Sequence, residues 1–241
     1  MRRIGHKGAD LITPGNTLAS FDSAVAHGAD MIEFDVLPED VRDPRGSRLV
    51  LAHDYTHDLA GAPTLEEGLD HLAGDAFAGI DLDVDLKLPG YEDRVVQALR
   101  DRGLVDRALV STMYVETVDR LKQLEPRLRV GWSVPKARRD YTLSPIWKVP
   151  AYGMIRVGRL VLPWRTAREI RRGRCDAFMV YWRLVTPRLV RAIQAAGGEL
   201  YVWTVDDERR IRAFEAMGVD GVITNDPRLF GPQVMSQIAA E

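Results

Sequence analysis

This chain of 241 residues lacks several features that mark specialised protein classes. It has one cysteine, Cys175, so no internal disulfide can form, and a reducing compartment suits it. No run of about 18 apolar residues occurs, so no transmembrane helix is expected. The first residues, MRRIGHKG, hold no apolar segment typical of a secretory signal. From these absences we expect a cytoplasmic protein without a transmembrane segment.

Excess charge is also missing, because 33 lysines and arginines nearly balance 35 aspartates and glutamates, for a formal net charge of −2. Chains that bind nucleic acid are usually markedly basic, so we expect no nucleic-acid partner. Low-complexity segments and repeats of solenoid period are absent. The 46% hydrophobic content is that of an ordinary globular protein.

What the sequence does contain is an alternation of short β-rich runs and helical patterns. Strands are expected at residues 3–6, 31–37, 48–53, 80–87, 108–112, 129–133, 177–182, 199–205 and 221–224. Helices are expected at residues 17–28, 63–74, 92–102, 115–124, 187–196 and 207–217. Such alternation indicates a parallel sheet with crossover helices. We therefore predict an α/β fold, a single (β/α)8 TIM barrel over residues 1–241.

Three local details refine this prediction. Nine candidate strands compete for eight places, and residues 36–48 are too few for a crossover helix, so the strand near Val50 should be the irregular one. Residues 135–174 are interpreted as an irregular loop followed by a helix near residues 166–172. Thr64 and Glu67 form a capping-box pattern, and Gly15 after Pro14 favours a type II turn.

Titratable residues gather at the ends of the first four expected strands. In chain order they are His6, Glu33, Asp35, His53, Asp54, Asp85 and Lys87. Side chains alternate along a strand, so Glu33 and Asp35 share one face, as do Asp85 and Lys87. A barrel gathers the carboxyl ends of its strands on its catalytic face. We therefore expect these side chains to converge.

Converging carboxylates would repel one another unless a cation compensated them. Glu33, Asp35 and Asp85 supply oxygen ligands that suit one divalent cation, Mg²⁺ or Ca²⁺, and Mn²⁺ is also possible. His6 and His53 could then act as general acid and general base. Lysines near this cluster, Lys87 and Lys7, would stabilise an anion, and the combination suggests phosphoryl chemistry. Each motif alone is more often a solvated or ion-paired surface feature.

Taken in order, the segments HKG, PGNT, GADMIEFDV, LVLAHD, DLK, VWTVDD and GVDGVITNDP resemble the glycerophosphodiester phosphodiesterase family, whose members are phosphatidylinositol-phosphodiesterase-like TIM barrels. The resemblance spans residues 3–227. It implies a phosphoric diester hydrolase that releases an alcohol and sn-glycerol 3-phosphate. In the implied mechanism the substrate's own 2-hydroxyl attacks phosphorus, one histidine removes its proton, the other protonates the leaving alcohol, and water opens the cyclic phosphate.

The resemblance also implies roles for individual residues. His6, His53 and Lys87 would be catalytic; Glu33, Asp35 and Asp85 would bind the metal; Lys7, Asn16 and Trp203 would bind substrate. Trp203 would form an aromatic wall for the organic end of the substrate, although a tryptophan of the barrel core is an equally good interpretation.

Three positions depart from the family pattern. Lys7 replaces an arginine, so the planar guanidinium that can bind a phosphate through two hydrogen bonds is missing. Gly15 replaces a glutamate. If that glutamate orients the arginine in the family, we hypothesise that it is dispensable where the arginine is replaced by lysine. Asp85 replaces a glutamate and is shorter by about 1.5 Å. Spider-venom phospholipase D enzymes share this Asp-x-Lys, so the substrate class is less certain than the reaction class.

Two alternatives to the glycerophosphodiesterase activity therefore stay open. The aromatic and basic segment 141–164 favours a lysophospholipase D-type enzyme with peripheral lipid contact through Trp147, Tyr152 and Trp164. The same segment could simply pack its apolar residues on the barrel. Loss of the arginine and glutamate could also leave an inactive barrel that binds a phosphorylated ligand. The alcohol, the metal and the oligomeric state are not set by the sequence.

Overall fold

The structure is a computed structural model, and it describes residues 1–56, 59–136 and 148–231. Its strands are β1 (Arg2–Gly5), β2 (Met31–Pro38), β3 (Leu49–Leu51), β4 (Asp81–Leu86), β5 (Ala108–Thr112), β6 (Arg129–Val134), β7 (Ala177–Tyr181), β8 (Glu199–Trp203) and β9 (Gly221–Thr224). Its α-helices are α1 (Leu18–Ala26), α2 (Leu65–Leu72), α3 (Glu92–Asp101), α4 (Val115–Leu124), α5 (Lys148–Arg171), α6 (Pro187–Gln194) and α7 (Glu208–Met217).

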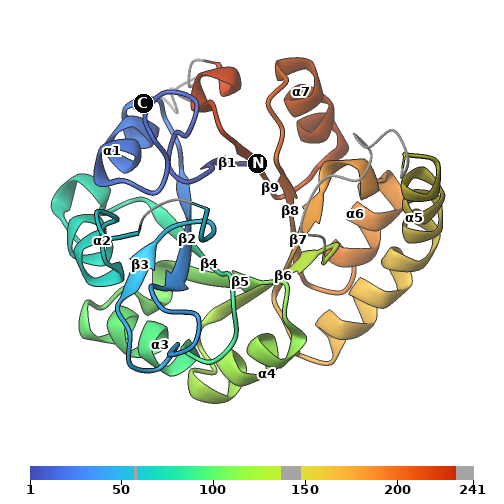
Figure 1. Cartoon of the computed structure of the whole chain (residues 1–241). Coiled ribbons are helices and arrows are strands. Elements are labelled where there is room, and N and C mark those ends of the chain that lie inside the picture. Colours follow the sequence, from blue (N-terminus) through green and yellow to red (C-terminus); the bar gives the residue numbers. More distant parts are fainter. Residues whose placement is uncertain (57–58, 137–147, 232–241) are drawn as a thin grey trace, which may run out of the picture.

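The strands of the described residues form one sheet in the order β1-β9-β8-β7-β6-β5-β4-β2-β3, and pairing of β1 with β2 closes it. All neighbours in the closed ring are parallel, and the helices surround it (Figure 1). The predicted (β/α)8 barrel is confirmed. The prediction for the ninth strand is also confirmed, because β3 lies outside the ring and pairs antiparallel with β2, with Val36 opposite Leu51.

Alternation along the strands produces two separate apolar layers. Inside the barrel lie Ile4, Met31, Leu109, Ala177, Met179, Tyr201 and Ile223. A larger layer, between the barrel wall and the helices, includes Phe21, Phe34 and Leu69. At the amino end of the strands, Arg129 bonds the Tyr201 hydroxyl at 2.8 Å and pairs with Glu199. This end of the barrel is therefore filled by ion pairs, and the opposite end is free for a site.

The helix-capping pattern at Thr64 is confirmed, since its hydroxyl accepts from the Glu67 amide while Glu67 accepts from the Thr64 amide. The type II turn at Pro14–Gly15 is wrong. The left-handed residue is Asn16, with φ of 58°, one position later than expected. The reason is that Asn16 has specific partners on β2, and asparagine tolerates this conformation better than most residues.

The interpretation of residues 135–174 needs correction. The helix expected near residues 166–172 is only the last part of α5, which begins at Lys148. Apolar residues lie on both faces of α5, and Pro163 interrupts its pattern, so the helical period is hidden in the sequence. Residues 137–147, which include Tyr141 and Trp147, lie outside the described residues. Among the described residues, no helix is long and apolar enough to cross a bilayer.

Candidate active site

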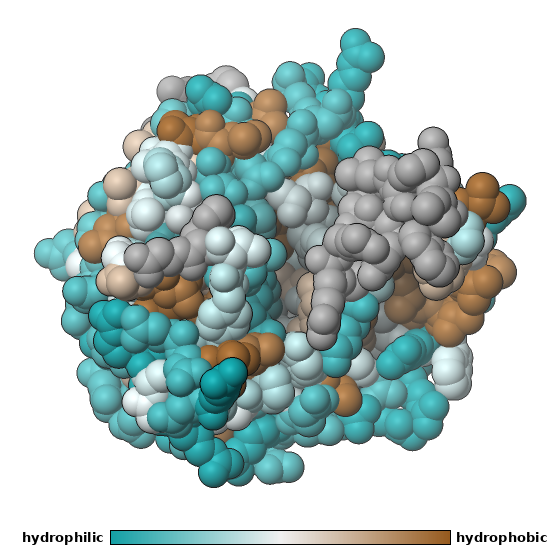
Figure 2. Space-filling model, in the orientation of Figure 1, coloured by the Kyte–Doolittle hydropathy of each residue, from teal (hydrophilic) through white to brown (hydrophobic). Residues whose placement is uncertain are grey.

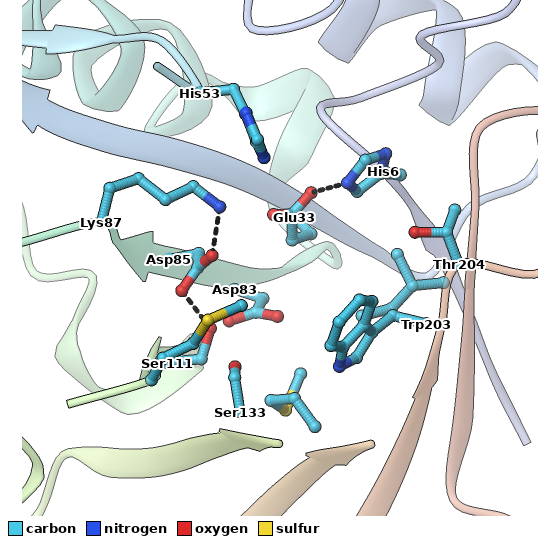
Figure 3. Close-up of a pocket in the computed structure, with 13 residues that line it drawn as sticks. His6, Glu33, His53, Asp83, Asp85, Lys87, Ser111, Ser133, Trp203 and Thr204 are labelled. Atoms are coloured by element: carbon cyan, nitrogen blue, oxygen red, sulfur yellow. Dashed lines mark hydrogen bonds and ion pairs between the residues drawn. The ribbon is translucent and has the colours of Figure 1, made fainter. Parts of the chain in front are cut away.

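A pocket opens at the carboxyl ends of the barrel strands (Figure 3). Among the residues that line it are His6, Glu33, His53, Asp83, Asp85, Lys87, Ser111, Ser133, Trp203 and Thr204. The structure thus brings six of the nine residues singled out in the sequence to one cavity. Of the other three, Asp35 lies fully buried behind the lining, and Lys7 and Asn16 approach from the β1–α1 loop.

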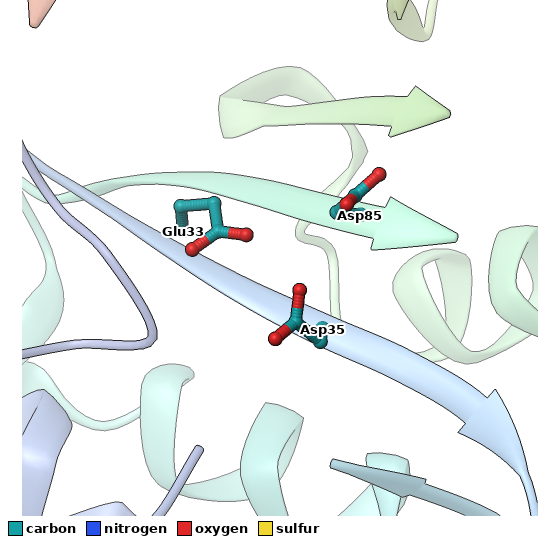
Figure 4. Close-up of side chains that lie close together, drawn as sticks. All are labelled: Glu33, Asp35 and Asp85. Atoms are coloured by element: carbon teal, nitrogen blue, oxygen red, sulfur yellow. The ribbon is translucent and has the colours of Figure 1, made fainter. Parts of the chain in front are cut away.

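Glu33, Asp35 and Asp85 form the acidic centre of the site (Figure 4). Each offers an oxygen atom, and these three atoms lie within 4.8 Å of one another. Glu33 and Asp35 project from the same face of β2, as the strand period predicted, and Asp85 projects from the neighbouring β4. Burial, and then the charge of Asp35, hold the pKa of Glu33 well above its ordinary value. The charged forms of these carboxylates therefore disfavour one another, and a bound cation would relieve that repulsion.

Lys87 supplies the one ammonium group seen within this acidic centre among the described residues. Its Nζ lies 2.5 Å from Oδ1 of Asp35 and also contacts Asp85. Burial by itself would raise the pKa of Asp35, but Lys87, His53 and His6 together hold that pKa below its usual range. Burial likewise opposes the charge on Lys87, whose pKa is nevertheless raised well above normal by Asp35, Asp85 and Glu33. The lysine and Asp35 are thus a buried ion pair.

Asp83 adds a fourth carboxyl group. It lies on β4 two residues before Asp85, so both side chains point to the inside of the barrel. It is 1% exposed, and neither carboxyl oxygen has a hydrogen-bond partner among the described residues. Burial, reinforced by the charge of Asp85, raises the pKa of Asp83 to about 8. A carboxyl group in this environment is protonated at neutral pH, so Asp83 adds little charge to the site.

His6 is held by the loop that follows β9. Its Nδ1 lies 2.5 Å from Oδ1 of Asn225, while its Nε2 lies 3.8 Å from Oε2 of Glu33. Nδ2 of Asn225 donates to Asp206 at 2.6 Å, and the Asn225 backbone amide donates to the same carboxylate at 2.8 Å. Burial lowers the pKa of His6 despite the opposing charge of Asp35. His6 therefore presents one ring nitrogen to the carboxylates and the other to an amide.

His53 reaches the pocket by a different route from the one expected. We expect it to converge with the other strand ends, but it follows β3, the irregular strand outside the closed ring. The β2–β3 hairpin instead folds back along β2 and delivers His53 from outside the ring. Its side chain is 52% exposed, and Nδ1 lies 3.2 Å from Asp54. The two histidines thus enter the pocket from separate elements (Figure 3), and His53, at 52%, is more exposed than His6, at 19%.

The β1–α1 loop positions the acidic residues through backbone and amide groups. Lys7 adopts φ of 49°, which turns its backbone N–H toward Oε2 of Glu33 at 2.8 Å. Asn16 contacts Asp35 twice: Nδ2 donates to Oδ2 at 2.9 Å, and Oδ1 accepts from the Asp35 amide at 3.0 Å. Gly8 makes the loop possible, because a Cβ there would lie 2.6 Å from backbone atoms of Ser20. Asn16 therefore orients Asp35 in this structure.

The side chain of Lys7 does not line the pocket. Its Nζ lies 3.2 Å from Asp10, whose other carboxylate oxygen accepts from the Gly15 amide at 2.9 Å. A Cβ at Gly15 would lie 2.4 Å from Asp10 and 2.8 Å from Cβ of Lys7. Asp10 thus places a carboxylate beside the point where a side chain at position 15 would begin, and it pairs with the Lys7 ammonium.

Trp203 lines the pocket from β8, and its ring packs against Tyr181 with centroids 5.6 Å apart. Its Nε1 is buried without a hydrogen-bond partner among the described residues. Trp203 thus both lines the pocket and packs against the apolar layer inside the barrel. Sequence reasoning missed Asn225, Asp206 and Asp10. The strand-end rule applied to VITNDP would have identified Asn225, since it follows β9 directly.

The residues present fit a divalent cation. They supply three carboxylates from two adjacent strands, and Lys87 pairs with Asp35 and Asp85 but leaves Glu33 without a lysine or arginine partner among the described residues. Carboxylate oxygens are the ligands that hard cations prefer. A metal ion could therefore be held by Glu33, Asp35 and Asp85, although the donor set does not select one ion.

Comparison with known proteins gives consistent results. The model of the glycerophosphoryl diester phosphodiesterase family matches residues 6–60 and 51–229. A glycerophosphodiester phosphodiesterase of Caldanaerobacter subterraneus is 26% identical over 258 residues, which cover 93% of this chain and 93% of that protein. A solved glycerophosphodiester phosphodiesterase of Parabacteroides distasonis has a TM-score of 0.70 at 18% identity, with 94% of this chain and 93% of that chain covered.

An Oleispira antarctica phosphodiesterase, solved in complex with the product sn-glycerol-3-phosphate, has a TM-score of 0.70 at 20% identity. That comparison covers 95% of this chain and 94% of the other. The structural comparisons show a shared fold, and the family model spans nearly all the chain, including both histidines and the acidic centre. The chain belongs to the glycerophosphoryl diester phosphodiesterase family.

Proposed function

We propose that this protein hydrolyses glycerophosphodiesters to an alcohol and sn-glycerol 3-phosphate, with one divalent cation bound by Glu33, Asp35 and Asp85. The observation that carries the proposal is the convergence of two histidines, three carboxylates and Lys87 in one pocket at the catalytic end of the barrel. The relative solved with sn-glycerol-3-phosphate supports the assignment of the product. When bound, the cation would polarise the phosphoryl oxygens and neutralise charge that develops on them.

The contacts of His6 favour it as the base of the first step. Asp206 can only accept hydrogen bonds, so Nδ2 of Asn225 points to Asp206 and Oδ1 points to His6. Oδ1 is an acceptor, so the neutral imidazole of His6 carries its proton on Nδ1. The lone pair of Nε2 then faces the acidic centre, where the substrate would bind. This tautomer is assigned from the hydrogen-bond network.

In the proposed reaction, Nε2 of His6 takes the proton of the substrate's 2-hydroxyl as that oxygen attacks phosphorus. The bond from phosphorus to the alcohol oxygen breaks, and His53 donates a proton to the departing alcohol, which leaves a cyclic phosphate. Water then attacks phosphorus and gives its proton to His53, while His6 returns its proton to the 2-oxygen. Both histidines regain their starting protonation states. Lys87 would bind the phosphate, and Trp203 would contact the organic end. Lys7, whose ammonium pairs with Asp10, would contribute through its backbone N–H, which donates to Glu33.

The test is release of sn-glycerol 3-phosphate from glycerophosphocholine by the purified protein with Mg²⁺, Ca²⁺ or Mn²⁺. We expect turnover with at least one of these ions and its loss with a chelator. His6→Ala and His53→Ala should each abolish turnover while the melting temperature and circular dichroism stay near those of the unaltered protein. Normal turnover in either variant would refute the acid–base assignment. An inert protein that still binds glycerophosphodiesters would instead be the inactive phosphoryl-ligand-binding barrel.

A lysophospholipase D-type activity is the second candidate, favoured by the exposed apolar residues that α5 places near the pocket. It predicts release of the headgroup from lysophospholipid while glycerophosphocholine stays intact. Running both substrates in parallel separates the two activities, since the product of one is a lysophosphatidate or its cyclic form and that of the other is sn-glycerol 3-phosphate.

A further inference from the structure

Helix α5 carries an unusual share of the apolar surface. Seven of the eleven exposed large apolar side chains found among the described residues belong to this one helix. They include Val149, 82% exposed, Leu160, 68%, Met154, 64%, Trp164, 63%, and Val157, 60%. In Figure 2 hydrophobic side chains gather at the edge of the molecule where Figure 1 places α5. Contiguous exposed apolar surface of this kind marks an interaction site.

The spacing of these residues makes them one stripe. Val157, Leu160, Val161 and Trp164 follow the i, i+3, i+4, i+7 pattern of a single helix face. The opposite face packs on the protein through other residues: Ala151, Leu162, Ala167 and Ile170 are buried. The fold therefore uses one apolar face of α5, and the second is not needed to attach the helix to the barrel.

The charges beside the stripe are all of one sign. Residues 149–168 contain Arg156, Arg159, Arg165 and Arg168 but no lysine, aspartate or glutamate, in a chain whose net charge is −2. All four arginines are exposed. The guanidinium of Arg168 lies 5.3 Å from the ring centroid of Trp164, so cation and apolar stripe are directly adjacent. The surface thus combines apolar side chains that can insert with cations that attract an anionic layer.

We propose that the outer face of α5 is a docking surface for a membrane that contains anionic lipids. A helix that lies in a membrane interface has this composition, with large apolar side chains on one face and lysines and arginines beside them. A second copy of the chain is a poorer occupant, because a two-fold interface would bring the same cations together. The proposal concerns binding alone and does not depend on the proposed reaction.

The position of α5 adds a reason for such docking. A groove beside the helix is lined by Met154, Leu162 and Arg165 together with Met113 and Ser133. Met113 and Ser133 also line the catalytic pocket. A membrane held against α5 would therefore lie next to the route into the site, where substrates derived from lipids would be most concentrated.

Vesicle co-sedimentation tests the proposal. The full-length protein is mixed with phosphatidylcholine vesicles that either contain or lack phosphatidylglycerol, at low and high salt. We expect binding to the anionic vesicles that weakens as salt increases. The triple variant Val157→Ser/Leu160→Ser/Trp164→Ser should lose binding. Arg156→Gln/Arg168→Gln should lower the affinity for anionic vesicles about 10-fold or more.

The controls separate docking from folding and catalysis. Val41→Ser removes an apolar side chain that is 53% exposed but lies away from α5, and it should bind vesicles like the unaltered protein. The triple variant should keep its melting temperature and any activity on glycerophosphocholine. The proposal is overturned if the unaltered protein does not bind anionic vesicles at low salt, or if the triple variant binds them as well as the unaltered protein does. A dimer in light scattering that the triple variant converts to monomer, without vesicle binding, would assign the face to a second copy.

Discussion

Nδ1 of His6 lies 2.5 Å from Oδ1 of Asn225, and the amide of Asn225 is in turn fixed by Asp206. The residue that orients the imidazole therefore comes from the last strand of the barrel, 219 positions away along the chain. A neutral amide in this place directs the proton to Nδ1 without adding a charge. This differs from an arrangement with a carboxylate partner, which would stabilise the imidazolium form.

Asn225→Ala is predicted to lower kcat about 10- to 100-fold, because His6 loses the acceptor that sets its tautomer and ring orientation, and with it part of its acid–base contribution. KM should change little, since Asn225 does not line the pocket. Asp226→Ala is the matched control: Asp226 is in the same turn but bonds Arg228 rather than His6. Steady-state kinetics on both variants checks this, and equal kcat values for Asn225→Ala and the unaltered protein would contradict it.

Gly15→Ala is predicted to destabilise the protein by about 1–3 kcal/mol, because the new Cβ would overlap Asp10 and Lys7 and force both to move. Urea unfolding measures the change. Gly79→Ala is the comparison, since a Cβ there meets nothing within 4 Å. By the same argument Gly15→Glu, which restores the family pattern, should not activate the enzyme while Asp10 and Lys7 are present. Activation by that substitution would contradict this prediction.

Binding of a divalent cation is predicted to raise the melting temperature, because an ion that binds only the folded state stabilises it. At about 100 times the dissociation constant this amounts to about 2.7 kcal/mol. Asp85→Asn should abolish most of the shift. Asp81→Asn should lower the melting temperature, because Asp81 pairs with Arg2, but should keep the shift caused by the metal. Calorimetry with and without Mg²⁺ or Ca²⁺ checks both variants, and an equal shift in Asp85→Asn would remove that residue from the metal site.

The sequence was sufficient for the barrel because each of its signals is local. Strand alternation placed Glu33 and Asp35 on one face, and the connection too short for a crossover helix identified β3 as irregular. The sequence was insufficient for the contacts that orient the site residues, because those contacts join residues far apart in the chain. The contacts of His6 with Asn225 and of Asn16 with Asp35 are set by closure of the barrel, which no local pattern records.

Two other features were hidden for different physical reasons. Helix α5 is apolar on both faces, so the periodicity that reveals an amphipathic helix is missing. Asp10 looks like an ordinary loop residue, and only its contacts with Lys7 and Gly15 show that it lies where a side chain at position 15 would begin. The motifs located the candidate site, but the structure was needed to show which groups orient the histidine and the lysine.

Tyr91→Phe is predicted to destabilise the protein by about 1–3 kcal/mol. The buried hydroxyl of Tyr91 donates to the Val36 carbonyl at 2.7 Å and accepts from the Leu88 amide at 3.2 Å. Removing it takes the partner from the Leu88 amide and leaves the Val36 carbonyl with only the Lys87 amide, at 3.2 Å, as its donor. A group left unpaired beside the ends of β2 and β4 costs its desolvation energy.

Tyr55→Phe is the matched control for this loss. The Tyr55 hydroxyl donates to the Pro38 carbonyl at 2.6 Å, but the residue is 42% exposed, so water can replace the hydroxyl. Its cost should stay below about 1 kcal/mol. Urea unfolding of both variants gives the comparison. Equal losses would mean that burial does not set the value of the Tyr91 hydrogen bonds, and that the carboxyl end of β2 is accessible to water in the folded protein.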